Sequence, residues 1–335
     1  MSGLRGRSLQ IVSWVGLGVS TVTLLFALPR LFDHGGGAGR VLGNAAAVGW
    51  TLLLITLAIA PVRTFGPRAV AGAWFSGFFG VISLSTLVGR PVVKHFGSDS
   101  AFAVAFWVPF TEEVLKLAPV ALLLVIATRN RQARPSVGDA VLFAATVGGG
   151  FAVYENALYA RSVGGWTAHP PLSLLVPSLQ TTSDGRGTTV LVGGHLVFTA
   201  VTGLGLALTL AYRRRFRGAW LAAPVSFAAV LIEHAMANEL SLVSAGATRP
   251  LWLTVARVIT LDGYLSTILL MGGLGLVAVV ERRLVRTTGM VPHPPRDAAV
   301  RKYLRSLRPE QRVVAGRAVA LAFVQCAPRR QEVRP

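Results

Sequence analysis

Long apolar runs recur along the chain and constrain its fold more than any other feature of the sequence. Each run has about 20 residues, the length that crosses roughly 30 Å of hydrocarbon as a helix. Because lipid offers no hydrogen-bond partners, the backbone of such a run must satisfy its own polar groups, as a helix does. We therefore predict an all-α fold, a polytopic transmembrane helical bundle with about eight membrane-spanning helices, near residues 9–29, 41–62, 69–89, 101–127, 138–160, 188–212, 218–241 and 263–281.

The composition agrees with a membrane protein and excludes several other classes. Hydrophobic residues make up 53% of the chain and charged residues 14%, against roughly 25% charged residues in a soluble globular domain. The net charge of +19 would suggest a nucleic-acid partner in a soluble protein, but here the arginines lie between apolar runs, where they report topology. The single cysteine, Cys326, excludes an intrachain disulfide and a thiolate metal cluster. We expect one membrane domain surrounded by the lipid bilayer, and no nucleic acid.

The basic residues also predict how the chain crosses the membrane. Dense arginine clusters at 129–134 and 213–217 fall on the same side as the N-terminus and the C-terminal tail. The positive-inside rule then places both termini in the cytoplasm. The first run follows Arg5 and Arg7 but is longer than the apolar core of a secretory signal, so we expect a membrane anchor there.

Two regions outside the apolar runs have more than one interpretation. Beyond Arg282 a proline-containing linker leads into a basic tail, 282–335, that either lies on an anionic membrane surface or forms a solvated helical extension. The connection 161–187 is long enough to cover a site as a lid, although an ordinary loop explains it equally well. We therefore divide the chain into a transmembrane bundle, 1–281, and a cytoplasmic tail.

Several ionisable side chains lie inside the apolar runs, where each costs about 2.5 to over 10 kcal/mol and commonly marks function. In the fourth run, TEEVLK at 111–116 places Glu112 and Glu113 within one helical turn of Lys116. A charge-neutralised pair that eases membrane insertion is the simpler interpretation. Two adjacent glutamates beside one lysine nevertheless leave one carboxylate free for chemistry.

The fifth run contains GGGFAVYENALY at 148–159. Gly148, Ala152 and Asn156 recur at four-residue spacing, so a neighbouring helix can approach this face closely. Glu155 lies beside that contact. It is either a site residue or a carboxylate that caps the end of the helix.

The sixth and seventh runs add two histidines. His195 shares a helical stripe with Thr199. His234 and Asn238 lie one turn apart, while Glu233 points about 100° away from His234. Taken singly, each histidine is explained by packing or by an interhelical hydrogen bond. At about 1.5 Å of rise per residue, however, the polar groups of all four alternating runs fall in the outer half of the membrane, which predicts one buried site.

Four short motifs follow in order on these runs: Glu112-Glu113-x-x-Lys116, Phe151-x-x-x-Glu155-Asn156, His195-x-x-Phe198-Thr199 and His234-x-x-x-Asn238. Together they resemble the PrsW family of intramembrane proteases, which is related to the CAAX prenyl endopeptidase and bacteriocin-processing superfamily. The resemblance covers about 101–241, the expected catalytic core. It implies an endopeptidase of a bacterial cytoplasmic membrane that cuts a membrane-anchored protein, in the best-known case a single-pass anti-sigma factor.

Peptide hydrolysis needs an activated water, a proton donor for the leaving amine and stabilisation of the oxyanion. Glu112 or Glu113 is the expected general base, with Lys116 keeping one carboxylate ionised. Asn238 would orient its partner or donate to the oxyanion, and Asn156 belongs to the expected site through its motif.

A metal ion is the second half of this hypothesis. His195, His234 and Glu155 could hold zinc with one coordination position open for water. A glutamate-activated water with histidine and asparagine donors would use the same residues without zinc. The sequence contains no H-E-x-x-H motif, which argues only against the ordinary zincin arrangement.

Two other functions use similar residues. A proton-coupled membrane transporter also buries carboxylates and histidines, but it should show paired interrupted helices or an inverted repeat, and the sequence shows neither. A non-catalytic membrane scaffold could retain an ancestral site. The intact polar set favours the enzyme.

Overall fold

The computed structural model describes residues 37–59, 67–98, 100–129, 136–158, 180–183, 189–213, 216–242 and 250–287. The first predicted span, 9–29, and the tail beyond residue 287 lie outside them, and the 161–187 connection is described only at 180–183. The elements are the helices α2 (Gly37–Ile59), α3 (Pro67–Phe75), α4 (Ile82–Phe96), α5 (Val108–Arg129), α6 (Val137–Leu158), α9 (Gly194–Tyr212), α10 (Ala222–Leu242), α11 (Leu251–Ile259) and α12 (Leu265–Thr287), the π-helical turns η1 (Ser76–Val81) and η2 (Phe102–Trp107), the 3-10 turn η3 (Arg217–Leu221), and the strands β1 (Gln180–Ser183) and β2 (Thr189–Val192).

Helices that can cross a membrane dominate the described residues. Five stretches are long and apolar enough to do so: Leu42–Ile59, Ala69–Phe96, Val137–Asn156, Gly194–Tyr212 and Arg217–Leu242. The apolar part of α12, Leu265–Val280, is shorter. α5 has 22 residues but carries the charged TEEVLK segment. The all-α polytopic bundle is confirmed, whereas the number of eight spans stays a prediction.

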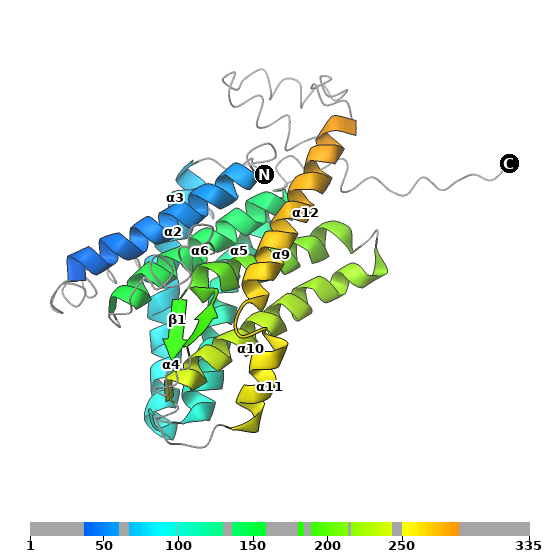
Figure 1. Ribbon diagram of the computed structural model, residues 1–335. Coiled ribbons are helices and arrows are strands. Elements are labelled where there is room, and N and C mark those ends of the chain that lie inside the picture. Colours follow the sequence, from blue (N-terminus) through cyan, green and yellow to red (C-terminus); the bar gives the residue numbers. More distant parts are fainter. Residues whose placement is uncertain are drawn as a thin grey trace.

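α6 is the central helix of the bundle (Figure 1). Nearly all of its apolar stretch is buried, and it packs against α9, α2, α3 and α5. Its start is fixed by a reciprocal cap, in which Asp139 N donates to Ser136 Oγ at 2.9 Å and Ser136 N donates to Asp139 Oδ2 at 3.1 Å. A Cβ at Gly148 would meet the carbonyl oxygen of His195 and, at 2.7 Å, Cβ of Thr199. The close approach predicted for this face of α6 is therefore confirmed.

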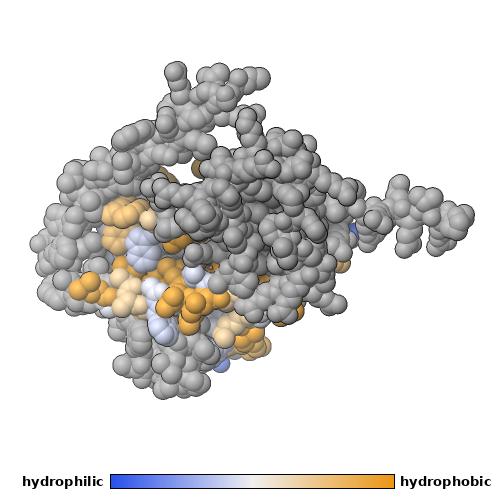
Figure 2. Space-filling view, turned by 90° about the horizontal axis from the view of Figure 1, so that it is seen from above, coloured by the Kyte–Doolittle hydropathy of each residue, from blue (hydrophilic) through white to orange (hydrophobic). Residues whose placement is uncertain are grey.

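The outer helices present apolar side chains to their surroundings. Leu57 on α2, Leu87 on α4 and Val258 on α11 are all more exposed than buried. Figure 2 shows that apolar colours cover most of the described surface seen from above. In water such a surface would drive association, so it is expected of helices that face lipid.

A short hairpin interrupts the helical pattern and corrects one sequence prediction. The predicted helix 188–212 begins only at Gly194, because β2 occupies 189–192 and pairs antiparallel with β1, with Gln180 opposite Val192. Gly194 has a φ of 67°, a left-handed conformation that separates the strand from α9 and favours glycine. The hairpin lies beside α10 (Figure 1). Residues 251–259, which none of the predicted spans includes, form α11.

Candidate active site

Lys116 lies at the centre of a buried group of charged side chains. Its Nζ atom is 2.9 Å from Glu113 Oε1, 3.5 Å from Glu112 Oε2 and 2.7 Å from His195 Nδ1. Lys116 and Glu113 are fully buried, and Nζ also lies 4.0 Å from the centroid of the Phe151 ring. Both carboxylates of the TEEVLK segment therefore share one ammonium group, and that group also reaches α9.

The two histidines complete this group from α9 and α10. Nε2 of His195 contacts Oε2 of Glu155 on α6. His234 lies 3.0 Å through Nδ1 from Glu113 Oε1, and 3.7 Å through Nε2 from Glu112 Oε2. Four helices thus bring their ionisable side chains into one connected set, named here the polar cluster: Glu112, Glu113, Lys116, Glu155, His195 and His234.

Aromatic rings fix the orientation of both imidazoles. The ring of Phe198 stacks on His234 with centroids 5.3 Å apart, and Phe151 meets His195 edge-on at 4.7 Å. The two imidazole rings are 4.9 Å apart. Because these rings are buried, the polar cluster is enclosed by apolar walls that strengthen its electrostatic interactions.

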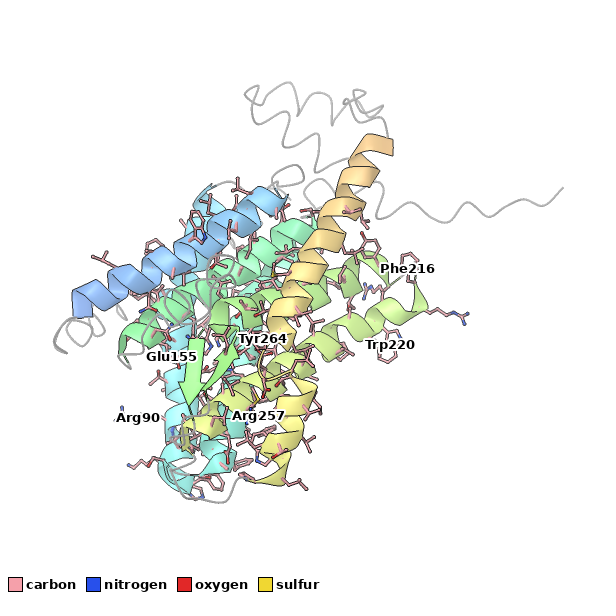
Figure 3. The ribbon with its side chains drawn as sticks, in the orientation of Figure 1. Arg90, Glu155, Phe216, Trp220, Arg257 and Tyr264 are labelled. Atoms are coloured by element: carbon pink, nitrogen blue, oxygen red, sulfur yellow. The ribbon has the colours of Figure 1, made fainter. Side chains whose placement is uncertain are left out.

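The polar cluster lies at one end of the bundle. Glu113, Glu155 and His195 are roughly 24 to 27 Å along their helices from the ends of α5, α6 and α9 that adjoin the arginine-rich connections, at about 1.5 Å per residue. Phe216 and Trp220, in the α9–α10 connection, lie far from Glu155 (Figure 3). Contacts among the six residues put them at one level of the bundle.

The two predicted asparagines bind neighbouring structure. Asn238 Nδ2 donates to the Val104 carbonyl oxygen at 3.0 Å and so ties α10 to η2, directly before α5. Asn156 Nδ2 donates to Asn44 Oδ1 at 3.2 Å, and Asn156 Oδ1 accepts from Gln180 Nε2 at 2.7 Å. A catalytic role for either asparagine stays a prediction.

A family comparison decides the kind of protein that carries this site. A family model described as PrsW family intramembrane metalloprotease matches residues 45–261, which is more than half of the chain. The chain belongs to the PrsW family. It is therefore an intramembrane protease, and its substrate is a membrane protein. Neither the curated proteins nor the solved structures that were compared gave a significant match.

The PrsW match is wider than the resemblance seen in the sequence. It begins within α2 and ends in the turn after α11, so the second and third predicted spans belong to the family core along with residues 101–241. Contacts give a reason. Ser85 Oγ of α4, inside the match, donates to Glu112 Oε1 at 3.4 Å, and Asn44 of α2, one residue before the match, bonds to Asn156.

A metal site fits the polar cluster of this PrsW-family protein. Glu112, His195 and His234 each offer a ligand atom, all within 4.8 Å of one another. Glu112 Oε2 lies 3.7 Å from His234 Nε2 and 4.0 Å from His195 Nδ1, whereas two ligand atoms of a tetrahedral zinc are about 3.3 Å apart. Closing the set around an ion would require the three ligand atoms to move together, since they are spread over as much as 4.8 Å. Glu155, the carboxylate predicted from sequence, contacts the opposite ring nitrogen of His195.

Sequence reasoning missed three residues that contact site residues, and it assigned no partner to a fourth residue, Glu233. Ser85, Asn44 and Gln180 belong to no motif, and their partners lie on other helices or on the hairpin. Glu233 was noticed as a buried acid that points away from His234, and its partners are on α12 and at the start of α9. A signal was present for Glu233, since an unpaired carboxylate inside an apolar run requires partners.

Proposed function

We propose that the polar cluster is the catalytic centre and that it hydrolyses a peptide bond of a membrane-anchored protein. The observation that carries the proposal is the connected contact network of six ionisable side chains from four helices, enclosed by apolar residues. Such a set costs too much in a membrane to persist as mere packing. The PrsW match supports a protease over a transporter or scaffold.

Glu113 is the proposed general base. Its Oε1 is held by Lys116 and His234, whereas its Oε2 is buried and has no hydrogen-bond partner among the described residues. That oxygen is placed to take a proton from water and to pass it to the leaving amine. Lys116 would place positive charge beside the developing oxyanion.

Glu112, His195 and His234 are the proposed ligands of a zinc ion, with Glu155 orienting His195 through Nε2. Glu155 as a direct ligand, the prediction from sequence, is the alternative. A bound zinc would lower the pKa of a coordinated water and polarise the scissile carbonyl. The protein residues then position the substrate, exclude bulk water and move the proton.

The cellular setting is proposed from the arginine distribution and the resemblance. Both termini would lie in the cytoplasm of a bacterial cell, with the bundle, 1–281, in the cytoplasmic membrane and the tail, 282–335, beneath it. The substrate would be a single-pass protein such as an anti-sigma factor. Placement of the polar cluster far from the arginine-rich connections supports cleavage in the outer half of the membrane.

The experiment uses the full-length protein in proteoliposomes with a single-pass reporter whose transmembrane helix carries tags at both ends. We expect the wild type to cleave the reporter and to contain a tightly bound metal. Glu113→Gln should lose about 10²- to 10⁴-fold in rate, the usual contribution of a general base. Glu239→Gln is the matched control. Like Glu113, Glu239 is a buried glutamate, but it lies on α10 and outside the polar cluster. Equal rates for the wild type and Glu113→Gln would refute the assigned site.

A further inference from the structure

Glu233 is a buried carboxylate that the catalytic centre does not use. It precedes His234 on α10 and is fully buried. Its Oε1 accepts from Gly193 N at 3.1 Å and from Ser266 Oγ at 2.6 Å, and its Oε2 accepts from Ser266 N at 2.9 Å. Both carboxylate oxygens are therefore engaged, by two segments that are distant in sequence.

These segments adjoin both catalytic histidines. Gly193 lies two residues before His195, and Glu233 lies directly before His234. One carboxylate consequently joins the backbone that carries one imidazole to the backbone that carries the other. The joint is tight, because a Cβ at Gly193 would meet Ser266 Oγ at 2.6 Å and Val197 Cγ1 at 2.8 Å.

Ser266 brings α12 into this junction. It is the second residue of α12, whereas the PrsW family match ends at residue 261. The turn before α12 is also fixed to the same region, since Gly263, with a φ of 91°, packs directly against the carbonyl oxygen of Leu191 in β2. The start of α12 therefore contacts the end of β2, and through Glu233 it is linked to α10 and to the start of α9.

We propose that Glu233 and Ser266 form a positioning clamp that sets the separation of His195 and His234, and through it the metal affinity and turnover of the site. The clamp rests on the proposed function, because it acts on the proposed metal ligands. It makes α12, which contributes no residue to the polar cluster, part of the catalytic apparatus. Loosening the clamp would let the two imidazoles drift apart without removing any ligand.

A purely structural contact makes a different prediction from a positioning clamp. Structural loss lowers stability and the amount of folded enzyme, but leaves the metal affinity and kcat of the folded fraction unchanged. Loss of a positioning contact lowers the metal affinity and kcat of protein that remains folded, since a misplacement of about 1 Å can cost up to about 10²-fold in rate.

The test compares Ser266→Ala with Thr267→Ala in the full-length protein. Thr267 is the neighbouring buried hydroxyl residue on α12, and its Oγ1 has no hydrogen-bond partner among the described residues. Zinc affinity is measured by competition with a chelator, ligand geometry by the visible spectrum of the cobalt-loaded protein, and kcat and KM separately with the cleavable reporter. Thermal midpoints report folding.

For Ser266→Ala we expect about a tenfold loss of zinc affinity and of kcat, the lower end of the range for supporting residues around a metal, with KM within about twofold. The cobalt spectrum should shift, while Thr267→Ala matches the wild type. Glu233→Gln should lose more than tenfold, as one acceptor is replaced by a donor. If this variant does not fold, Ser266→Ala still decides, because it keeps the Gly193 bond.

Two outcomes separate the clamp from the proposed function. A wild type that binds no metal and cleaves nothing would overturn both. A wild type that binds and cleaves, beside a Ser266→Ala variant indistinguishable from Thr267→Ala in metal affinity, spectrum and kcat, would overturn the clamp alone.

Discussion

The Nζ atom of Lys116 lies 2.7 Å from the Nδ1 atom of His195, a contact between α5 and α9 across 79 positions of sequence. The other ring nitrogen of His195 faces Glu155. Nδ1 is therefore the nitrogen that faces Glu112 and Glu113, and the ammonium group stands on the same side of the ring as the proposed zinc. The Lys116 ammonium group and a zinc ion bound at this site would therefore compete for the same imidazole nitrogen.

Replacing Lys116 with Met should therefore separate two properties. We expect zinc affinity to stay the same or to increase, because a competing positive charge is removed. Activity should fall by about tenfold or less, against about 10²- to 10⁴-fold for Glu113→Gln, because the lysine supplies charge and the glutamate carries the proton. Chelator competition measures the zinc affinity, and reporter cleavage measures the activity. Equal and complete loss in both variants, with folding intact, would favour a purely structural pair in TEEVLK.

Residues that work as one catalytic unit are strongly non-additive. We expect Glu113→Gln and His195→Ala each to abolish nearly all reporter cleavage, and the double variant to lose little more. Each protein is checked for expression and thermal stability. Independent sites would instead give single losses that multiply, for example about tenfold each and about a hundredfold together.

Removal of the metal should abolish activity reversibly. Dialysis of the wild type against a chelator is expected to stop cleavage, and stoichiometric zinc should restore it. His234→Ala, which removes one of three proposed ligands, should not recover at the same zinc concentration. Undiminished cleavage by protein shown to be metal-free would leave a glutamate-activated water as the mechanism.

The close contact between α6 and α9 should tolerate no side chain at Gly148. Gly148→Ala is expected to destabilise the protein by about 1 to 3 kcal/mol, the usual cost of overpacking, because the new methyl meets the His195 backbone and Thr199. Gly43→Ala on α2 is the control, since nothing lies within 4 Å of its added Cβ. Thermal unfolding in detergent measures both. Similar midpoints would mean that the two helices pack less tightly than the structure shows.

The predicted crossing pattern can be checked with reporter fusions after Arg215 and after Arg286. Both should report a cytoplasmic location, because the arginine-rich connections are expected on that side. An external location for either fusion would place the polar cluster in the inner half of the membrane.

The bundle and the grouping of charged residues were predictable because both depend on local spacing. Glu112, Glu113 and Lys116 lie within one helical turn, so their mutual contacts follow from helix geometry alone. The partners of Asn238 and Asn156 were not predictable. They are the Val104 carbonyl, Asn44 and Gln180, and their placement depends on the π-helical turn η2, on α2 and on the hairpin. The strand at 189–192 was taken for helix because a short apolar run fits either conformation.

The burial of α6 also bears on how the sequence can vary. α2 and α6 are both apolar enough to cross a membrane, yet only about a third of the α2 stretch is buried, against nearly all of α6. On α2, an exchange of one aliphatic residue for another changes mainly the surface that meets lipid. On α6 the same exchange alters a close-packed interior, where a change in side-chain volume of even one methylene group affects stability. Across related chains we expect the side-chain volumes at apolar positions to vary little on α6 and widely on α2. A hydropathy plot would nevertheless give the two helices similar values.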